Sequence, residues 1–206
     1  MADPVAQAYD GVAELYASLF RRELDEDADA WRWLTWFADL VPEGGLVADL
    51  GCGPGHGVEA LTRLGCRAIG VDLSPGQVGQ ARLAFPELEF VVGDLTELMF
   101  ADVSVGGIFA RYSVIHLPPD ELGAMFAEWH RVLSAGAPIL VSFFASLDSD
   151  DHSRPFDHKV TTAYELWPTT IADLLRQIGF TAIEVGTVPP EPGARPFNRG
   201  TLLARR

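Results

Sequence analysis

The 206-residue sequence contains little cysteine, and it lacks long apolar runs. Its two cysteines, Cys52 and Cys66, are too few for a disulfide framework, so we interpret them as cytosolic thiols. No apolar run approaches the roughly 20 residues that a transmembrane helix needs. The N-terminal stretch MADPVAQAYDG has neither the basic start nor the apolar core of a secretory signal. The sequence therefore predicts a cytoplasmic protein without a membrane partner.

Basic side chains are scarce as well. Lysine and arginine total 15 against 29 aspartate and glutamate residues, which gives a formal net charge of −14 at pH 7. An acidic surface repels phosphate groups, so we expect no nucleic-acid partner. The hydrophobic fraction of 48% and the charged fraction of 21% are typical of a globular protein. At this length, and without internal repeats, we expect a single domain over residues 1–206.

The first 42 residues have the pattern of a helical segment. Apolar residues recur at helical spacing from Val5 to Phe20, which predicts one amphipathic helix. The acidic run ELDEDADA should open a second helix, because negative side chains suit the positive end of the helix dipole. That helix continues through WRWLTWFADLV and should end at Pro42. We expect residues 1–42 to form a helical cap on the rest of the chain.

From residue 43 onward, strand and helix patterns alternate. The expected elements are strand 46–50, helix 57–64, strand 67–73, helix 75–84, strand 88–94, a strand within 105–114, helix 119–133, strand 137–145, helix 169–178, strand 180–186 and strand 197–205. Such alternation predicts an α/β fold with right-handed crossovers and a mostly parallel sheet that helices cover on both faces. The last two strands have no helix between them, so they should pair antiparallel at one edge.

A glycine-rich stretch follows the first expected strand. The sequence LVADLGCGPGHG, from Leu46 to Gly57, places glycine at every second position from residue 51 onward. Glycine lets a backbone approach another group closely, and ligands of such folds bind at the carboxyl ends of the strands. This stretch therefore predicts the ligand-binding loop of the protein.

Two kinds of ligand compete for this loop. A dinucleotide site needs the pattern G-x-G-x-x-G and an acid about 20 residues further on, and the spacing from Gly51 to Asp72 satisfies the second requirement. The third glycine of that pattern, however, falls on His56. Asp49 beside a pyrophosphate would add an unfavourable Coulomb energy, whereas a carboxylate suits a cationic ligand. S-adenosylmethionine meets this requirement, because it carries an ammonium and a sulfonium beside its nucleoside.

The loop DLGCGPG, from Asp49 to Gly55, closely resembles the D/E-x-G-x-G-x-G motif of class I S-adenosylmethionine-dependent methyltransferases. Four later stretches are similar to the family's following motifs and its fifth strand: GVDLS (70–74), VVGDLTEL (91–98), IFARYSVIHLPPDEL (108–122) and WHRVLSAGAPILVSF (129–143). The resemblance covers residues 40–145 with specific motifs and the remainder in outline. It implies a doubly wound, seven-stranded Rossmann-like sheet in the order 3-2-1-4-5-7-6, with strand 7 antiparallel.

The resemblance also implies roles for individual residues. Asp72 would accept hydrogen bonds from both ribose hydroxyls, and Asp94 would accept one from the adenine amino group, beside the backbone and apolar wall of Leu95. The backbone at Arg111 and Tyr112 would face the methionine end of the cofactor. The expected cofactor-binding residues, with Tyr9 near the methionine carboxylate, are Tyr9, Asp49, Gly51, Cys52, Gly53, Gly55, His56, Asp72, Leu73, Asp94, Leu95, Arg111 and Tyr112.

The acceptor side carries weaker signals. A sulfonium is already a good leaving group, so a base is needed only when the acceptor must lose a proton. The sequence leaves the catalytic residue unassigned: His116, Tyr112 and Tyr16 are the candidates, and we favour a packing role for His116. Residues 146–168 have no clear period and form a predicted acceptor-side insert. The acids and histidines at 148–158 lack the spacing of metal ligands, so we predict a solvated loop and no metal site.

These patterns together predict an S-adenosylmethionine-dependent methyltransferase that acts on a small-molecule acceptor and releases S-adenosylhomocysteine. Its Rossmann-like core would span residues 43–206. Two alternatives stay open: a nicotinamide-dependent oxidoreductase, and a protein that binds S-adenosylmethionine without catalysis. The sequence does not distinguish a monomer from a homodimer.

Overall fold

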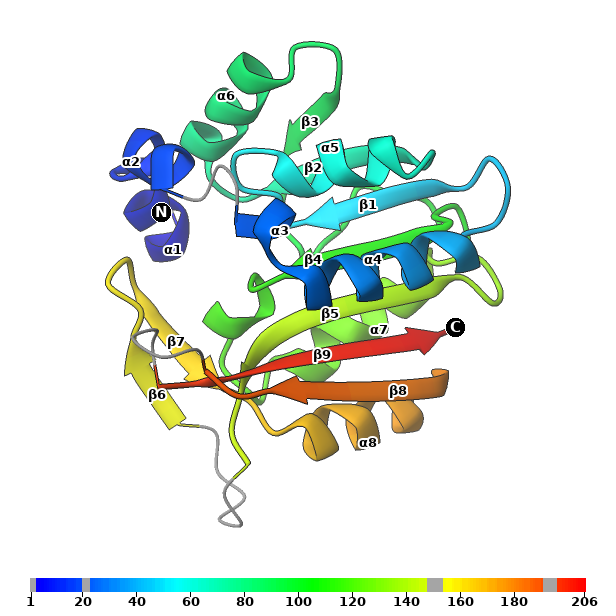
Figure 1. The fold of residues 1–206 in the computed structure, drawn as a ribbon. Coiled ribbons are helices and arrows are strands. Elements are labelled where there is room, and N and C mark those ends of the chain that lie inside the picture. Colours follow the sequence, from blue (N-terminus) through cyan, green and yellow to red (C-terminus); the bar gives the residue numbers. More distant parts are fainter. Residues whose placement is uncertain (1–2, 20–22, 148–153, 191–195) are drawn as a thin grey trace.

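The computed structural model describes residues 3–19, 23–147, 154–190 and 196–206, in which a seven-stranded sheet has the order β3-β2-β1-β4-β5-β9-β8 (Figure 1). Its strands are β1 (Leu46–Leu50), β2 (Arg67–Asp72), β3 (Glu89–Val92), β4 (Gly107–Arg111), β5 (Pro138–Ala145), β8 (Thr181–Val188) and β9 (Asn198–Arg205). Strands β1 to β5 are parallel, and β9 is antiparallel to both β5 and β8. The predicted order 3-2-1-4-5-7-6 is confirmed, because β9 and β8 are the seventh and sixth strands of this sheet along the chain.

Helices cover both faces of the sheet (Figure 1). The principal ones are α4 (Ala28–Leu40), α5 (His56–Arg63), α6 (Pro75–Ala84), α7 (Leu122–Val132) and α8 (Pro168–Ile178). In β1, Val47 packs with side chains of α4 and α5, whereas its neighbour Ala48 packs in the cluster that includes α7 and α8. Strands buried on both faces explain the nearly continuous apolar runs in the sequence. Among helices in the described ranges, none combines the length and apolar character that crossing a membrane requires.

The first part of the predicted cap, which we call the N-terminal cap from here on, consists of two short helices, so the prediction of one helix from Val5 to Phe20 is wrong. Helix α1 (Pro4–Asp10) ends at Gly11, and α2 (Ala13–Leu19) follows after a turn. Glycine has a low helix propensity. Both helices pack against α6, and the side chain of Asp10 bonds to the start of that helix, which redirects the chain (Figure 1).

The predicted insert at 146–168 contains a β-hairpin that its sequence period did not indicate. Strand β6 (Arg154–Asp157) pairs antiparallel with β7 (Thr162–Glu165), and the two form a separate sheet. The backbone at Leu166 bonds to Phe144 and Ser146, which anchors the hairpin at the end of β5. Strands of four residues are too short to show an alternating pattern. The acid cluster of the predicted loop falls partly on residues 148–153, outside the described residues.

Two helix starts also differ from the prediction. Helix α7 begins at Leu122 rather than at residue 119, because the backbone N–H of Glu121 donates to the Pro118 carbonyl and closes a turn first. The acidic run before α4 forms a four-residue helix, α3 (Glu23–Glu26), which is followed by the N-cap residue of α4. The Asp27 carboxylate accepts a hydrogen bond from the backbone N–H of Ala30 at 3.1 Å and starts α4.

Trp129 of α7 joins the core to the turn that follows β3. Its side chain is fully buried and contacts the Phe126 ring edge-on, with the centroids 5.3 Å apart. Its indole Nε1 donates to the Leu95 carbonyl at 2.8 Å. The turn that carries Asp94 and Leu95 is therefore attached to the central helix of one face.

We predict that Trp129→Phe lowers the free energy of unfolding by about 1–3 kcal/mol, because it leaves a small cavity and an unpaired Leu95 carbonyl. The matched control is Trp36→Phe, at a side chain that is 43% exposed. The control should change stability by less than about 0.5 kcal/mol. Urea unfolding followed by circular dichroism measures both, and equal losses would show that the Trp129 contacts do not stabilise the core.

Candidate functional site

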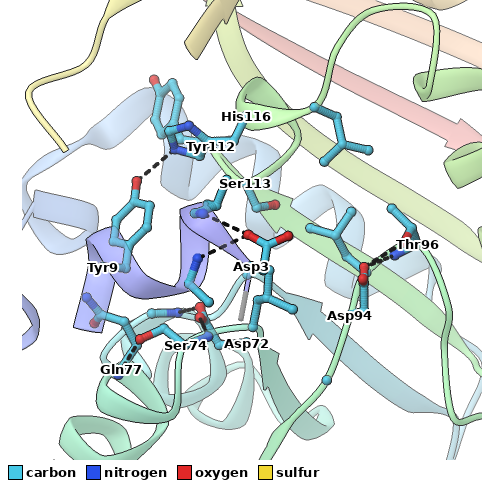
Figure 2. Close-up of a pocket in the computed structure, with 18 of the residues that line it drawn as sticks. Asp3, Tyr9, Asp72, Ser74, Gln77, Asp94, Thr96, Tyr112, Ser113 and His116 are labelled. Carbon is cyan, nitrogen blue, oxygen red and sulfur yellow. Dashed lines mark hydrogen bonds between the residues drawn. The ribbon is translucent and has the colours of Figure 1, made fainter. Parts of the chain in front are cut away.

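The carboxyl ends of β1 to β4 and the N-terminal cap enclose a cavity of about 300 Å³ (Figure 2). Such a position, at the carboxyl edge of a parallel sheet, is where α/β folds bind ligands. The wall combines the loops after these strands with α1, α2 and the 3₁₀ helix η1 (Val114–His116). The lining residues include Tyr9, Tyr16, Gly51, Gly53, Asp72, Leu73, Ser74, Gln77, Asp94, Leu95, Thr96, Arg111, Tyr112 and His116.

The glycine loop after β1 is constrained by contacts with neighbouring segments of the chain, and it also borders the cavity. The backbone N–H groups of Gly51 and Cys52 both donate to the Val71 carbonyl, at 2.8 and 3.1 Å, which ties the loop to β2. Gly51 has φ +76°, and a Cβ there would lie 2.2 Å from the Ser113 Cβ. Gly51 and Gly53 both line the cavity, but a Cβ on Gly53 would meet nothing closer than 4.0 Å. Glycine is therefore required for two reasons in this loop: close packing within the protein at Gly51, and close approach to the cavity at Gly53. The sequence indicated only the second.

Asp49 is buried beneath this loop and does not line the cavity. Its carboxylate lies under the start of α5: a Cβ on Gly57 would be 2.3 Å from Oδ2, and the Val58 backbone N–H donates to it. Burial, then the charge of Asp72, raises the pKa of Asp49 to about 8, and Arg111 opposes this shift. In the ligand-free protein this acid is mainly protonated at neutral pH, and a cation nearby would favour its ionised form.

Asp72 ends β2 and has both carboxylate oxygens held by backbone N–H groups. Oδ2 accepts from Gly53 at 2.8 Å, and Oδ1 accepts from Ser74 at 2.9 Å. Burial raises the pKa of this carboxyl, and the two hydrogen bonds oppose the rise. A carboxylate fixed in this way presents its remaining lone pairs to the cavity in one orientation.

Asp94, in the turn after β3, is the second acid in the wall. Its Oδ1 accepts from the backbone N–H of Thr96 at 2.7 Å and from the Thr96 hydroxyl at 2.6 Å (Figure 2). Leu95 beside it lines the cavity and is held through its carbonyl by Trp129. The predicted polar and apolar parts of this wall thus lie side by side.

Two adjacent residues of α1 connect the cap to opposite sides of the cavity. The Asp10 carboxylate accepts from the Ser74 hydroxyl at 2.5 Å and from the Gly76 N–H at 2.7 Å. The Tyr9 hydroxyl lies 2.8 Å from His116 Nε2 (Figure 2). Helix α1 is therefore held both at α6, after β2, and at η1, after β4.

His116 joins the cap to the hairpin. Its Nδ1 lies 2.9 Å from the Thr162 carbonyl, which only accepts hydrogen bonds. Nδ1 therefore carries the proton and donates, and Nε2 accepts from the Tyr9 hydroxyl. Burial lowers the pKa of His116, so the neutral ring predominates at pH 7. This arrangement agrees with the favoured packing role and also leaves a basic nitrogen within reach of a cavity-lining hydroxyl.

The backbone at the end of β4 is strained where it meets the cavity. Tyr112 has φ +55°, which is unfavourable for a residue with a side chain. Its ring packs on Phe144, with centroids 4.9 Å apart, and the Arg111 guanidinium lies 5.1 Å from its centroid. Arg111 Nη2 is also 4.0 Å from the Asp27 carboxylate. These contacts hold the strained turn in place.

Most of the residues expected from the sequence come together at this cavity. Nine predicted cofactor residues line it, as do all three catalytic candidates: Tyr9, Gly51, Gly53, Asp72, Leu73, Asp94, Leu95, Arg111, Tyr112, Tyr16 and His116. Asp49, Cys52, Gly55 and His56 lie behind the wall; the His56 ring packs edge-on against Phe85, at 5.5 Å, and Cys52 is buried.

Sequence reasoning missed several lining residues, among them Gln77 and Thr96. Ser74 also lines the cavity, and it is the N-cap of α6, where its hydroxyl accepts from the Gln77 backbone N–H. Thr96 follows Asp94 by two residues, the spacing of an Asx turn, and that spacing is a signal that could have identified it. Gln77 has no such signal, because its importance depends on burial.

Comparison with known proteins agrees with this geometry. A family profile described as a methyltransferase domain matches residues 47–136, which contain the glycine loop and the cavity residues after β2, β3 and β4. An uncharacterized methyltransferase of Synechocystis sp. is 28% identical over 153 residues, which cover 69% of this chain and 70% of that protein. A demethylmenaquinone methyltransferase of Beutenbergia cavernae is 32% identical over 143 residues, covering 69% of this chain and 58% of that protein.

The match to curated relatives is partial in length. Three further methyltransferases are matched over only 34%, 40% and 42% of their own length. Among solved structures, a 1,6-didemethyltoxoflavin-N1-methyltransferase of Burkholderia thailandensis has a TM-score of 0.68 at 23% identity, covering 100% of this chain and 91% of that one. That structure holds 1,6-didemethyltoxoflavin and S-adenosylhomocysteine, and its likeness to this chain concerns the fold.

The profile match and the related sequences point to one family, and the sheet order agrees with it. Neither a nicotinamide-dependent oxidoreductase nor a non-catalytic binding protein is favoured by these matches. The cofactor of the family is S-adenosylmethionine, as the sequence analysis predicted. Residues 47–136 match the methyltransferase-domain family, the related sequences include S-adenosylmethionine-dependent methyltransferases, and the sheet order is the one predicted for the class I, Rossmann-like members.

Proposed function

We propose that this chain binds S-adenosylmethionine in the cavity at the end of β1 to β4 and transfers its methyl group to a small-molecule acceptor. The observation that carries the proposal is the convergence of Gly53, Asp72 and Asp94 on one wall, beneath a helical cap. The product would be S-adenosylhomocysteine. We further propose that the protein has no nucleic-acid partner, because its net charge is −14, and that it is cytoplasmic, because Cys52 and Cys66 are free thiols.

The chemistry of the wall suits the proposed cofactor. Asp72 offers fixed acceptor lone pairs for the ribose hydroxyls, since both of its oxygens are already oriented by backbone N–H groups. Asp94 is an acceptor for the adenine amino group, with Leu95 as the adjacent apolar surface. Asp49 contributes through charge from beneath the loop. These negative groups would balance the ammonium and sulfonium in a poorly solvated site.

The residues on the other side of the cavity would bind the acceptor. S-adenosylmethionine supplies an electrophilic methyl group on a sulfonium that leaves readily. The chain's own task is to align the acceptor atom in line with that group and to exclude water. Tyr9 and Tyr16 from the cap, and Tyr112 and His116 after β4, form an aromatic wall opposite the acids, and we propose that the acceptor lies against it.

The need for a base depends on the acceptor. A hydroxyl must lose a proton on methylation, and the unprotonated Nε2 of His116 can receive it through the Tyr9 hydroxyl. A carboxylate or thiolate acceptor requires no such step. We therefore propose His116 and Tyr9 as the proton-accepting pair for hydroxyl acceptors only.

Two experiments test the proposed function. Calorimetric titration should show binding of S-adenosylhomocysteine and none of NADH; the reverse result would replace this proposal with a dinucleotide enzyme. Incubation with methyl-labelled S-adenosylmethionine and a metabolite extract should then label a small molecule. Labelling would distinguish an enzyme from a non-catalytic binding protein, and it would identify the acceptor.

We predict that Asp72→Asn weakens S-adenosylhomocysteine binding by about 1–3 kcal/mol, because it removes a charge-assisted hydrogen bond to the ribose. Asp39→Asn, at an exposed position of α4, is the matched control and should bind like the wild type. Calorimetry measures both affinities. An Asp72→Asn affinity equal to that of the control would remove Asp72 from the ribose site.

Asp49 should make the stability of the ligand-free protein depend on pH. Its pKa is raised from 3.8 to about 8 by burial, so the unfolded chain loses this proton before the folded chain does. Stability from this group is present below pH 4 and is lost as the pH rises toward 8. Asp49→Asn should therefore become more stable relative to the wild type from pH 5 to pH 8 in urea unfolding. A difference that is constant over this range would contradict the prediction.

A further inference from the structure

Gln77 is a polar side chain in the cavity wall whose amide makes no hydrogen bond to the part of the chain that the structure describes. It is the third residue of α6 and is 1% exposed. Neither Nε2 nor Oε1 has a hydrogen-bond partner among the described residues, although both atoms are buried. Almost all buried polar groups in proteins are paired, because an unpaired one destabilises the fold. The side chain therefore requires an explanation.

The common structural role for this residue does not apply here. A serine N-cap followed by glutamine at the third helical position is a capping box, in which the glutamine side chain accepts from the serine N–H. Ser74 and Gln77 have this spacing, and the Ser74 hydroxyl accepts from the Gln77 backbone N–H at 3.0 Å. The Ser74 N–H, however, donates to Asp72 Oδ1 at 2.9 Å. Asp72 therefore accepts the hydrogen bond that the glutamine side chain would accept in a capping box.

The neighbouring polar groups are engaged with one another. Asp72 holds the N–H groups of Gly53 and Ser74, and the Ser74 hydroxyl donates to Asp10. The Gln77 amide oxygen lies near the glycine loop, 4.0 Å from the position of a Cβ on Gly53. The amide is thus placed in the same corner of the cavity as Asp72 and Gly53, all three of which line it.

Packing alone does not account for the amide. Methionine has nearly the same length and volume and would fill the same space without an unpaired polar group. A carboxamide contributes something that methionine lacks, which is hydrogen bonding to a partner that enters the cavity.

We propose that the Gln77 carboxamide is a binding residue for the nucleoside part of S-adenosylmethionine, beside Asp72. This inference rests on the proposed function. A carboxylate such as Asp72 only accepts hydrogen bonds, so it uses the protons of the ribose hydroxyls and leaves their oxygens available. The Gln77 NH₂ supplies the donor that those oxygens need. We expect the outer torsion angles of Gln77 to change on binding, because both polar atoms of its amide are buried.

The test compares Gln77→Met with Gln80→Met, a half-buried glutamine on the same helix. Calorimetry with S-adenosylhomocysteine and with 5′-methylthioadenosine, which lacks the amino-acid part, measures binding. Gln77→Met should weaken both ligands about 3- to 10-fold, the value of one neutral hydrogen bond. It should also raise the melting temperature of the ligand-free protein by about 2–4 °C, because an unpaired buried amide is removed. Gln80→Met should change neither quantity.

The outcomes separate this inference from the proposed function. If wild-type protein does not bind S-adenosylhomocysteine, the proposed function fails. If it binds and Gln77→Met binds equally well, the inference about Gln77 is wrong and the function stands. A Gln77→Met variant that weakens S-adenosylhomocysteine alone overturns the nucleoside assignment. One that melts lower than the wild type overturns the binding role in favour of a structural one.

A measurement on the wild-type protein covers the case in which the variant does not fold. The side-chain amide resonances of Gln77, selectively labelled with ¹⁵N, should shift on addition of S-adenosylhomocysteine, because the amide gains a hydrogen-bond partner. Unchanged Gln77 amide resonances at saturating ligand would overturn the proposal.

Discussion

The arrangement of the cavity depends on the carboxylate of Asp72, which receives backbone N–H groups from two segments. One comes from Gly53 in the loop after β1, and the other from Ser74 at the start of α6. Ser74 in turn bonds to Asp10 of the cap. A single acid at the end of β2 therefore sets the relative positions of the glycine loop, of helix α6 and, through Ser74, of the N-terminal cap. Its burial costs free energy, and these hydrogen bonds offset that cost.

The parts of this protein that its sequence predicts are those with local signals. Alternating apolar strands and helices indicated a mostly parallel sheet with an antiparallel edge, and the run from Asp49 to Gly57 indicated where the ligand site begins. The order of the strands came from the family resemblance of that run and the motifs after it. The break between α1 and α2, by contrast, follows from the contact of Asp10 with residues 74 and 76. The Tyr9–His116 pair joins positions 107 residues apart. Contacts of this kind leave no periodic pattern, because each partner is an ordinary residue in its own segment.

The glycine loop shows how one pattern can have two causes. The alternation of glycines was interpreted as close approach to a ligand, and Gly53 has the open position that this requires. At Gly51 and Gly57, however, a side chain would collide with Ser113 or Asp49. The position of Asp49 also differs from the simple interpretation. Its charge was expected to act at the ligand directly, and it lies one layer below, under the start of α5. The glycine loop thus lies between the buried Asp49 carboxylate and the cavity.

The imidazole of His116 has a consequence for the relative motion of two segments of the chain. The ring binds the cap on one side, through Tyr9, and the β6–β7 hairpin on the other, through the Thr162 carbonyl. Neither the cap nor the hairpin can move away from η1 without breaking a hydrogen bond to that ring. Displacement of the cap and displacement of the hairpin are therefore coupled through one side chain, although the two segments lie far apart in the sequence.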